Sequence, residues 1–341
     1  MSISTNTPHV TYTEQELDSA LALLAGARDV TVLGHLNPDP DAFGSMVALG
    51  LALRALGATV RVSFGSPDEL PPSLSIVDPG DLYVRASELS KDAPGLLVTV
   101  DCASLGRLDG LSGLPETTVE AGGSVLVVDH HMSNTRFGTH HLVDVTAEST
   151  TVIVLRLIDA LGVELTEPIA RAVYAGLLTD TSSFRRAKPS THEVAARLIA
   201  AGVDPDTTGR ALIGTHPFGR LRMLAAVFGR AVYDQEAARG LGVVFTSVLL
   251  EDMVGLPAEE AESVIDTVRG SGEAEVAAVL KQAGPTEWVG SLRAIGHLDV
   301  NAVATVFGGG GHRFAAGFST TGTLDEVRER LFAALADAPL V

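Results

Sequence analysis

The sequence predicts an α/β protein with a larger part built on a parallel sheet and a smaller mixed part behind it. Short β-branched runs alternate with helical stretches from about residue 28 to residue 185, which is the pattern of a parallel sheet. The length of 341 residues exceeds what one hydrophobic core normally holds. From about Arg230 the pattern changes to longer strands and fewer helices, so we expect a second domain there.

The first part is expected to alternate strand and helix in order. After the strand Val30–Gly34, residues 42–56 carry apolar side chains at helical spacing and end at Gly57, a typical helix stop. Ser190 and Glu193 form the pattern of a capping box, which predicts a helix through Ala201. The other strands expected here are residues 60–64, 96–100 and 125–128, and the other helices are residues 151–161 and 168–178.

The second part is expected to hold a smaller mixed α/β fold. We place the first domain at residues 1–203, a helical linker at 204–229 and the second domain at 230–341, because residues 204–229 lack strand character. The expected strands are residues 241–249, 274–281, 288–294 and 314–318, and the expected helices are residues 258–268, 300–307 and 323–336. The last helix begins with acidic residues, which its dipole favours.

Composition excludes several classes of function. A formal net charge of −18 argues against a protein that grips long nucleic acid through many phosphates, whereas a short anionic ligand remains compatible. The apolar stretches are too short to span a membrane, and the polar residues 1–13 lack the pattern of a secretory signal. The single cysteine, Cys102, fits a reducing cytoplasm, and we interpret it as a small buried apolar residue instead of a nucleophile.

Carboxylates and imidazoles recur where four apolar runs end. The carboxyl ends of parallel strands meet at one edge of a sheet, where ligands bind, so we expect these side chains to gather. Buried carboxylates repel one another and persist where cations neutralise them, and mixed oxygen and imidazole ligands suit Mn, Mg or Co. The residues are His35, Asp39 and Asp41 after the first run, Asp101 after the second, Asp129, His130 and His131 after the third, and Asp180 after the fourth.

The segment after the first strand has two interpretations. Pro38 and Pro40 alternate with Asp39 and Asp41, and proline stiffens the backbone around itself. A stiff loop can hold two carboxylates at a set separation, as metal ligands require. Taken alone, an aspartate that caps the following helix is at least as good an interpretation. The other acidic and histidine motifs favour ligands.

The four motifs resemble those of a known superfamily. The stretches HLNPDPDAFGS, VTVDCAS, VVDHHMSN and GLLTDTSSF match in order and spacing the motifs of the DHH phosphoesterases, named for the triplet at residues 129–131. The stretch VGSLRAIGHLDVNAVATVFGGGGHRFAAGF resembles the DHHA1 domain that accompanies the catalytic domain in part of the superfamily. Within it, the sequence most resembles the bifunctional oligoribonucleases, or nanoRNases, that also dephosphorylate 3′-phosphoadenosine 5′-phosphate (pAp).

The resemblance implies a centre of two Mn²⁺ ions, for which Mg²⁺ or Co²⁺ can substitute. Asp101 would bridge the two ions, and Asp129 would orient His130, since ligating imidazoles usually donate their second N–H to such a group. His131 would face the scissile phosphate. Its alternative interpretation is a structural histidine outside the metal ligands. One ion would be bound by His35, Asp39 and Asp101, and the other by Asp41, Asp101, His130 and Asp180.

The resemblance also implies substrate contacts, and a cleft between the two domains that would measure substrate length. The glycines of residues 308–311 suit a close approach of backbone N–H groups to a phosphate, although a flexible turn explains them equally well. Arg185, Arg186 and Lys188 either line the entrance or form a solvated basic loop. The residues expected to contact substrate are Asn134, Arg293, Gly309, Gly310, Gly311, His312 and Arg313.

The function that follows is a cytoplasmic, homodimeric phosphoesterase. Its expected substrates are short RNAs, pAp, pApA and cyclic di-AMP, with no long duplex and no membrane as partner. One alternative is a manganese inorganic pyrophosphatase, which the GGGGH segment opposes. Another is a long-strand exonuclease of the same superfamily, which the acidic charge opposes. The third is a nucleotide sensor without turnover, which the complete set of ligands opposes.

Overall fold

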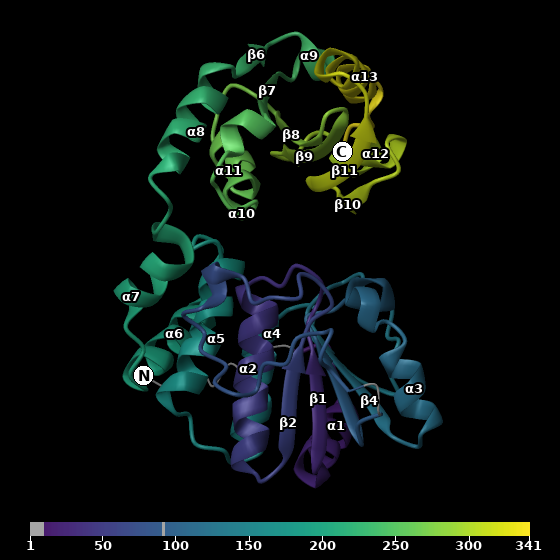
Figure 1. Cartoon of the computed structure of the whole chain (residues 1–341), viewed down its shortest axis with the longest axis vertical. Coiled ribbons are helices and arrows are strands. Elements are labelled where there is room, and N and C mark those ends of the chain that lie inside the picture. The colour runs from purple at the N-terminus through teal and green to yellow at the C-terminus, as the bar shows by residue number, and fades with distance from the viewer. Residues whose placement is uncertain (1–9, 91–92) are drawn as a thin grey trace, which may run out of the picture. The chain divides into compact units, whose positions relative to one another are not determined.

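The computed structural model describes residues 10–90 and 93–341 of the chain. Part of the polar segment interpreted above, residues 1–9, therefore lies outside the described residues. The chain divides into two compact units, Met1–Thr215 and His216–Val341 (Figure 1). The predicted linker contains helix α7 (Pro205–Gly209), the π-helical turn η3 (Arg210–Gly214) and helix α8 (Gly219–Gly229), and the division between the units falls inside it.

The first unit is built on a sheet of five strands that are all parallel, as predicted. Their order across the sheet is β2-β1-β3-β4-β5. Strand β2 therefore lies on one side of β1, and strands β3, β4 and β5 follow in order on its other side. The strands are β1 (Asp29–Leu33), β2 (Thr59–Ser63), β3 (Leu96–Val100), β4 (Ser124–Asp129) and β5 (His140–Val143).

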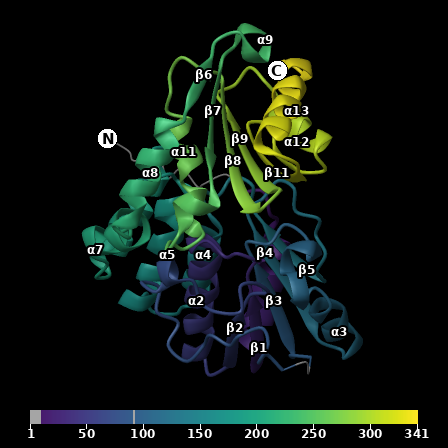
Figure 2. The ribbon, with the colours of Figure 1, turned by 45° about the horizontal axis from the view of Figure 1, so that its top comes forward.

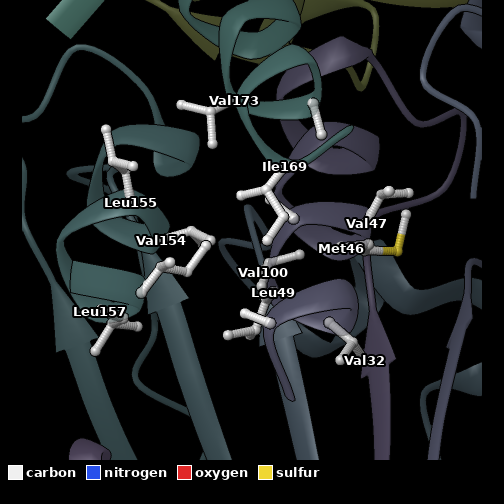
Figure 3. Close-up of a cluster of buried hydrophobic side chains, with 14 of the residues drawn as sticks. Val32, Met46, Val47, Leu49, Val100, Val154, Leu155, Leu157, Ile169 and Val173 are labelled. Atoms are coloured by element: carbon white, nitrogen blue, oxygen red, sulfur yellow. The ribbon is translucent and has the colours of Figure 1, made fainter. Parts of the chain in front are cut away.

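The helices of the first unit cover both faces of this sheet. The larger hydrophobic cluster joins one face to α2, α4 and α5, and Figure 3 shows its side chains interdigitating between these helices and strands β1 and β3. A smaller cluster joins the other face to η2 and α3. The helices are α1 (Glu14–Gly26), α2 (Pro40–Ala55), α3 (Leu114–Glu120), α4 (Thr150–Ala160), α5 (Glu167–Asp180) and α6 (Pro189–Ala200), with 3-10 turns η1 (Pro72–Leu74) and η2 (Leu105–Leu111).

Helix α6 begins earlier than the predicted capping box. Lys188 is its N-cap, and Pro189 occupies the first helical position, where proline is favoured because its φ is already helical. The hydroxyl of Ser190 instead donates to Glu148 (3.2 Å). The prediction was wrong because a tertiary contact uses the hydroxyl that the local pattern assigns to a cap.

The second unit contains a mixed sheet of six strands in the order β10-β11-β9-β8-β7-β6. Strands β7 and β8 pair in parallel, and the other neighbours are antiparallel. Figure 2 shows α8 and α11 on one side of this sheet and α12 and α13 on the other. The strands are β6 (Val232–Asp234), β7 (Val243–Val248), β8 (Val276–Gly284), β9 (Glu287–Ala294), β10 (Gly310–His312) and β11 (Ala315–Thr321).

Two predicted elements of the second unit differ from the structure. The helix expected at residues 258–268 is divided at Ser263, whose hydroxyl bonds to the carbonyl of Glu260 (3.4 Å) and so competes with the helical backbone pattern. The glycine run is partly a strand, because Gly310 and Gly311 belong to β10. The helices and turns are α9 (Ala237–Gly240), η4 (Leu250–Met253), α10 (Glu259–Glu262), α11 (Val264–Val268), α12 (Val300–Val306) and α13 (Leu324–Asp337).

The part of the chain that the structure describes contains no helix with both the length and the apolar character needed to cross a membrane.

Close contact between α2 and α5 depends on a glycine. A Cβ added at Gly44 of α2 would lie 2.3 Å from the carbonyl oxygen of Ala172 in α5. No side chain can move aside to relieve this overlap, because the neighbouring atom belongs to the backbone. The two helices therefore approach as closely as they do because residue 44 has no side chain.

We expect Gly44→Ala to destabilise the protein by about 1–3 kcal/mol, the usual cost of adding a methyl group to a packed core. Gly26→Ala at the end of α1 is the matched control, because a Cβ there meets nothing within 4 Å. The melting temperature of the metal-free protein measures both. Equal melting temperatures for the two variants would contradict the packing argument.

Candidate metal centre

Two predicted ligands lie where the strand order of the first sheet reverses. His35, which is 5% exposed, follows β1, and Asp101, which is 3% exposed, follows β3. Strands β1 and β3 are parallel neighbours, and the crevice outside such a reversal is where open α/β sheets bind ligands. Asp101 has a φ of 54°, a conformation that aspartate tolerates better than most residues, and its chain turns out of the strand there.

Asp39 uses its two carboxylate oxygens for different purposes. Oδ1 accepts the backbone N–H groups of Asp41 (3.0 Å) and Ala42 (2.9 Å), so Asp39 is the N-cap of α2. Oδ2 lies 3.7 Å from Nε2 of His35. The two interpretations left open by the sequence, a cap and a ligand, are therefore compatible in one side chain.

The Asp101 carboxylate faces two groups at once. Its Oδ2 lies 3.5 Å from Nε2 of His35. Its Oδ1 lies 3.6 Å from Nε2 of His130 and 3.6 Å from Nδ1 of His131. Each oxygen thus points to a different set of potential ligands.

A second set of ligand atoms gathers around His130. Its Nε2 lies 3.3 Å from Oδ2 of Asp180, at the end of α5, and 4.0 Å from Oδ2 of Asp41, in the first turn of α2. The ligand atoms of Asp41, His130 and Asp180 all lie within 4.8 Å of one another, and so do those of His35, Asp39 and Asp101. The structure brings together all six predicted ligands, but only the first implied set forms one complete group. Asp101 does not belong to the group of Asp41, His130 and Asp180, and it forms a third group with His130 and His131.

Backbone carbonyls orient the two imidazoles. Nδ1 of His35 lies 2.7 Å from the carbonyl oxygen of Leu36, and Nδ1 of His130 lies 3.4 Å from that of Ala147. A carbonyl can only accept, so each Nδ1 carries a proton and each Nε2 is the nitrogen left for other partners. Both Nε2 atoms face the carboxylates.

Asp129 orients His131 and not His130, contrary to the prediction. Its Oδ1 lies 2.8 Å from Nδ1 of His131, while Oδ2 accepts the side-chain amide of Asn134 (2.6 Å). Asn134 also donates to the carbonyl of Cys102 (3.2 Å). Both N–H bonds of Asn134 are thus used inside the protein, so its predicted phosphate contact is replaced by a positioning role. The error arose because the sequence cannot say which of two adjacent imidazoles turns toward the carboxylate.

Helix α4 holds the carboxylate of Asp41, which is fully buried. The backbone N–H groups of Thr150 and Thr151 donate to its Oδ2 (2.7 Å) and Oδ1 (2.9 Å). A negative charge at the start of a helix is also favoured by the helix dipole. On the other side, a Cβ added at Gly176 of α5 would lie 2.4 Å from Oδ1 of Asp41, so a glycine is needed there.

These supporting residues were not found from the sequence. The hydroxyl residues Ser149, Thr150 and Thr151 at the start of an apolar run do indicate a helix start. Nothing in that local pattern says that the helix end faces a carboxylate 109 residues earlier in the chain.

In the second unit, Arg293 and His312 lie in one row of the sheet. His312 on β10 pairs with Ala315 on β11, which in turn pairs with Arg293 on β9. Directly paired residues point to the same face, so these side chains share a face with a small residue between them. Arg293 lines a cavity of about 210 Å³ and makes no ion pair with the described residues. Arg313 lies next in sequence and approaches Asp299 (3.8 Å) instead.

The glycines that precede His312 make backbone hydrogen bonds and allow close backbone packing. The N–H groups of Gly308 and Gly309 donate to Thr305 and Ala304 at the end of α12. A Cβ at Gly309 would lie 2.2 Å from the carbonyl oxygen of Gly317 on β11. Gly309 is therefore part of a tight helix-to-strand connection, and its N–H does not point freely toward a ligand as the predicted phosphate loop requires.

Comparison with known proteins identifies the chain. Residues 29–177 match the N-terminal domain of the DHH family and residues 244–338 match the DHHA1 domain. The bifunctional oligoribonuclease and PAP phosphatase NrnA of Thermus thermophilus is 32% identical over 335 residues, covering 97% of this chain and 96% of that protein. The chain belongs to the DHH phosphoesterase family. Its resemblance to this family, inferred from the motifs, is thereby confirmed.

Two other relatives of this DHH protein differ in coverage. A probable manganese-dependent inorganic pyrophosphatase of Streptococcus mutans is 30% identical but covers 54% of this chain and 59% of its own length. The solved structure of an exopolyphosphatase-related protein from Bacteroides fragilis covers 95% of this chain and 96% of its own, with a TM-score of 0.86 and 21% identity. The second likeness shows that the fold extends through both the DHH and the DHHA1 domains.

Two carboxylates of the candidate centre, Asp41 and Asp180, are poor anions in the absence of a cation. Burial and the charges of Asp101 and Asp39 raise the pKa of Asp41 well above its usual range. Burial and the charge of Asp41 raise the pKa of Asp180 to about 10. Burial opposes protonation of His35, but its hydrogen bonds and charge interactions with Asp101 and Asp39 outweigh this and raise its pKa to about 10.

The donor atoms fit a divalent cation. Two imidazole nitrogens combined with carboxylate oxygens suit Mn²⁺, Mg²⁺, Co²⁺ or Zn²⁺, and the absence of thiolates disfavours soft ions. A cation would replace the protons that the carboxylates otherwise retain, since ligands bind metals in their deprotonated form. The electrostatics of the DHH domain therefore favour metal binding.

We expect the metal-free protein to lose stability as pH rises from about 6.5 to 9. The pKa of Asp180 rises on folding from 3.8 to about 10 and that of His35 from 6.5 to about 10. In this window the folded state holds protons that the unfolded state has released, so stability falls with pH. Melting temperatures in EDTA at several pH values measure the effect.

Saturating Mn²⁺ is expected to remove this slope, because bound ligands are already deprotonated. The control is Asp180→Asn, which should show a shallower slope in EDTA while the rest of the acidic surface is unchanged. A melting temperature in EDTA that stays constant or rises between pH 6.5 and 9 would contradict the expectation.

Proposed function

We propose that this DHH protein is a two-metal phosphoesterase that degrades short oligoribonucleotides to mononucleotides and dephosphorylates pAp to AMP. The linear dinucleotide pApA and cyclic di-AMP belong to the same proposed set of substrates. The Thermus thermophilus relative, named as a bifunctional oligoribonuclease and PAP phosphatase, aligns over 97% of this chain. That coverage supports the proposal because both the DHH and the DHHA1 domains take part in the alignment.

The observation that carries the proposal is the direction of the two Asp101 oxygens. One faces His35 and the other faces His130, so a single carboxylate can serve two cations. The ions of two-metal hydrolases lie about 3.5–4 Å apart, which places both within reach of one shared carboxylate.

In this proposal one ion is held by His35, Asp39 and Asp101, and the other by Asp41, Asp101, His130 and Asp180. The manganese-dependent relative named above, which aligns with half of the chain, supports Mn²⁺ as the ion, with Mg²⁺ or Co²⁺ as substitutes. When bound, the pair supplies a Lewis acid for the phosphoryl oxygens and an acidified water at neutral pH.

His131 is the proposed acid. Its Nδ1 is held by Asp129 (2.8 Å), which leaves Nε2 for substrate. The hydrogen bond to Asp129 raises the pKa of His131, so the imidazole is readily protonated near neutral pH. As the oxygen of water forms its bond to phosphorus and the ester P–O bond breaks, His131 donates its Nε2 proton to the leaving oxygen. Asn134 keeps Asp129 in place throughout.

Cations near the proposed ligands suit a phosphate-bearing substrate. Arg186 donates to the backbone carbonyl of Asp180 (2.6 Å), and the backbone carbonyl of Arg107 accepts from Leu36, next to His35 (2.8 Å). Arg107, Arg185 and Arg186 make no ion pair with a carboxylate among the described residues. They are the proposed contacts for substrate phosphates in the DHH domain.

The DHHA1 domain is proposed to bind the part of the substrate distal to the cleaved bond. The row formed by Arg293 and His312 offers two cationic or donor groups on one face, and Ala315 between them leaves space. An arginine can hold a phosphate through two parallel hydrogen bonds. Burial lowers the pKa of Arg293 but leaves this strongly basic group charged at neutral pH.

We expect catalytic efficiency to be highest on RNAs of about two to five nucleotides, a range set by a pocket-sized site. Each further nucleotide adds a phosphate that meets an acidic surface of formal net charge −18. The assay compares kcat/KM in Mn²⁺ for pAp, pApA, RNAs of five and fifty nucleotides, duplex DNA, cyclic di-AMP and pyrophosphate. Equal efficiency on the two RNAs would contradict the proposal, and pyrophosphate as the best substrate would favour the pyrophosphatase.

We expect Asp101→Asn to lower kcat/KM by about two orders of magnitude or more, because changes behind a ligand already cost about 10–100-fold. Asparagine tolerates the positive φ at this position, so the fold should persist. Asp109→Asn is the matched control, since Asp109 also has a positive φ (52°), is exposed and is not one of the predicted ligands. An Asp101→Asn variant with full activity and two bound Mn²⁺ would exclude the shared ligand.

A further inference from the structure

The start of helix α4 contacts two different carboxylates of the proposed metal centre. Asp41 comes from α2 and Asp101 from the end of β3, yet Thr150 bonds to both. Its backbone N–H donates to Oδ2 of Asp41 (2.7 Å), and its hydroxyl donates to Oδ1 of Asp101 (2.8 Å). Thr150 is fully buried, so water does not compete for either bond.

The hydroxyl of Thr150 has a special importance for Asp101. Among the described residues it is the one hydrogen-bond donor other than imidazole that reaches this carboxylate. Asp101 leaves its strand with a positive φ, and its backbone N–H bonds to Val128 (3.0 Å), so the neighbouring backbone does not fix the carboxylate plane. The bond from Thr150 to Oδ1 fixes that plane, and Oδ2 is then directed to His35.

The neighbouring threonine provides a contrast. The side chain of Thr151 is also fully buried, but its hydroxyl bonds to that of Ser149 (2.7 Å) and not to a carboxylate. Two adjacent buried threonines in the same helical turn thus differ in one respect. The hydroxyl of Thr150 contacts a proposed metal ligand, whereas the hydroxyl of Thr151 does not.

We propose that Thr150 is a positioning residue that sets the direction in which Asp101 presents its oxygens to the two cations. This inference rests on the proposed two-metal function. The hydroxyl of Thr150 contacts Oδ1 of Asp101, the oxygen that faces His130, while the bond to Asp41 is made by the backbone and does not depend on the side chain. Loss of the hydroxyl therefore weakens the ion bound near His130 more than the ion bound by His35 and Asp39.

The experiment compares Thr150→Val, Thr150→Ser and Thr151→Val by titrating the metal-free protein with Mn²⁺ and counting bound ions. Thr150→Val keeps the shape but removes the hydroxyl, and it should bind one of two ions about 10–100-fold more weakly, the usual effect of losing a group behind a ligand. The other ion should bind with an affinity close to that of wild type, because the hydroxyl of Thr150 contacts neither His35 nor Asp39. Thr150→Ser retains the hydroxyl and should bind both ions as wild type does.

Thr151→Val is the control for the loss of a buried hydroxyl in this turn. It keeps the backbone N–H that donates to Asp41 and should therefore keep both Mn²⁺ affinities. Melting temperatures in EDTA report whether each variant is folded. Wild-type affinities in Thr150→Val, an equal loss in Thr151→Val, or a loss in Thr150→Ser would each overturn the positioning role. If Thr150→Val does not fold, Thr150→Ala, which also lacks the hydroxyl, takes its place, and wild-type Mn²⁺ affinities in that variant would overturn the role.

Failure of the proposed function gives a different result. If the wild-type protein binds fewer than two Mn²⁺ ions, or hydrolyses none of the nucleotides, the proposed two-metal phosphoesterase function is contradicted, whatever the variants show. If the wild-type protein binds two ions and hydrolyses nucleotides but Thr150→Val has wild-type affinities, only the positioning role of Thr150 is contradicted.

Discussion

The mutual repulsion of four carboxylates in one small volume is the constraint on which the rest of the DHH domain depends. Asp39, Asp41, Asp101 and Asp180 come from α2, from the end of β3 and from the end of α5. Such a group is unfavourable unless donors or cations compensate it. The protein supplies the donors it can: the first turn of α2 for Asp39, the first turn of α4 for Asp41, an imidazole for Asp180, and imidazoles with the hydroxyl of Thr150 for Asp101. The negative charge that these donors leave uncompensated favours the binding of a cation.

Bringing these carboxylates together requires helices that approach more closely than side chains normally allow. Gly44 lets α2 touch the backbone of α5, and Gly176 lets α5 pass beside the Asp41 carboxylate and the start of α4. The large cluster in Figure 3 lies beneath this contact and supports all three helices. The glycines inside these helices reduce helix propensity, but they allow three elements to present polar groups at one point.

The strands, the parallel sheet and the gathering of acidic residues could be predicted because each depends on a local pattern or on a general property of parallel sheets. The partners of individual side chains could not. Asn134 turns inward to Asp129, and Ser190 bonds to Glu148 in place of its own helix, because residues distant in sequence offer the better partner. The role of the glycine run before His312 was also ambiguous. Glycine is required both where two backbone segments pack closely and where a backbone approaches a phosphate.

The cap formed by Asp39 has a consequence for ion selectivity. One of its oxygens is fully engaged by two amides at the start of α2, so Asp39 can offer a cation the other oxygen alone. Both oxygens of Asp41 likewise each accept an amide. Ca²⁺ prefers six to eight oxygen ligands and often takes both oxygens of one carboxylate. In the proposed centre Asp39 therefore offers a cation a single oxygen, which suits a smaller cation with fewer ligands better than it suits Ca²⁺.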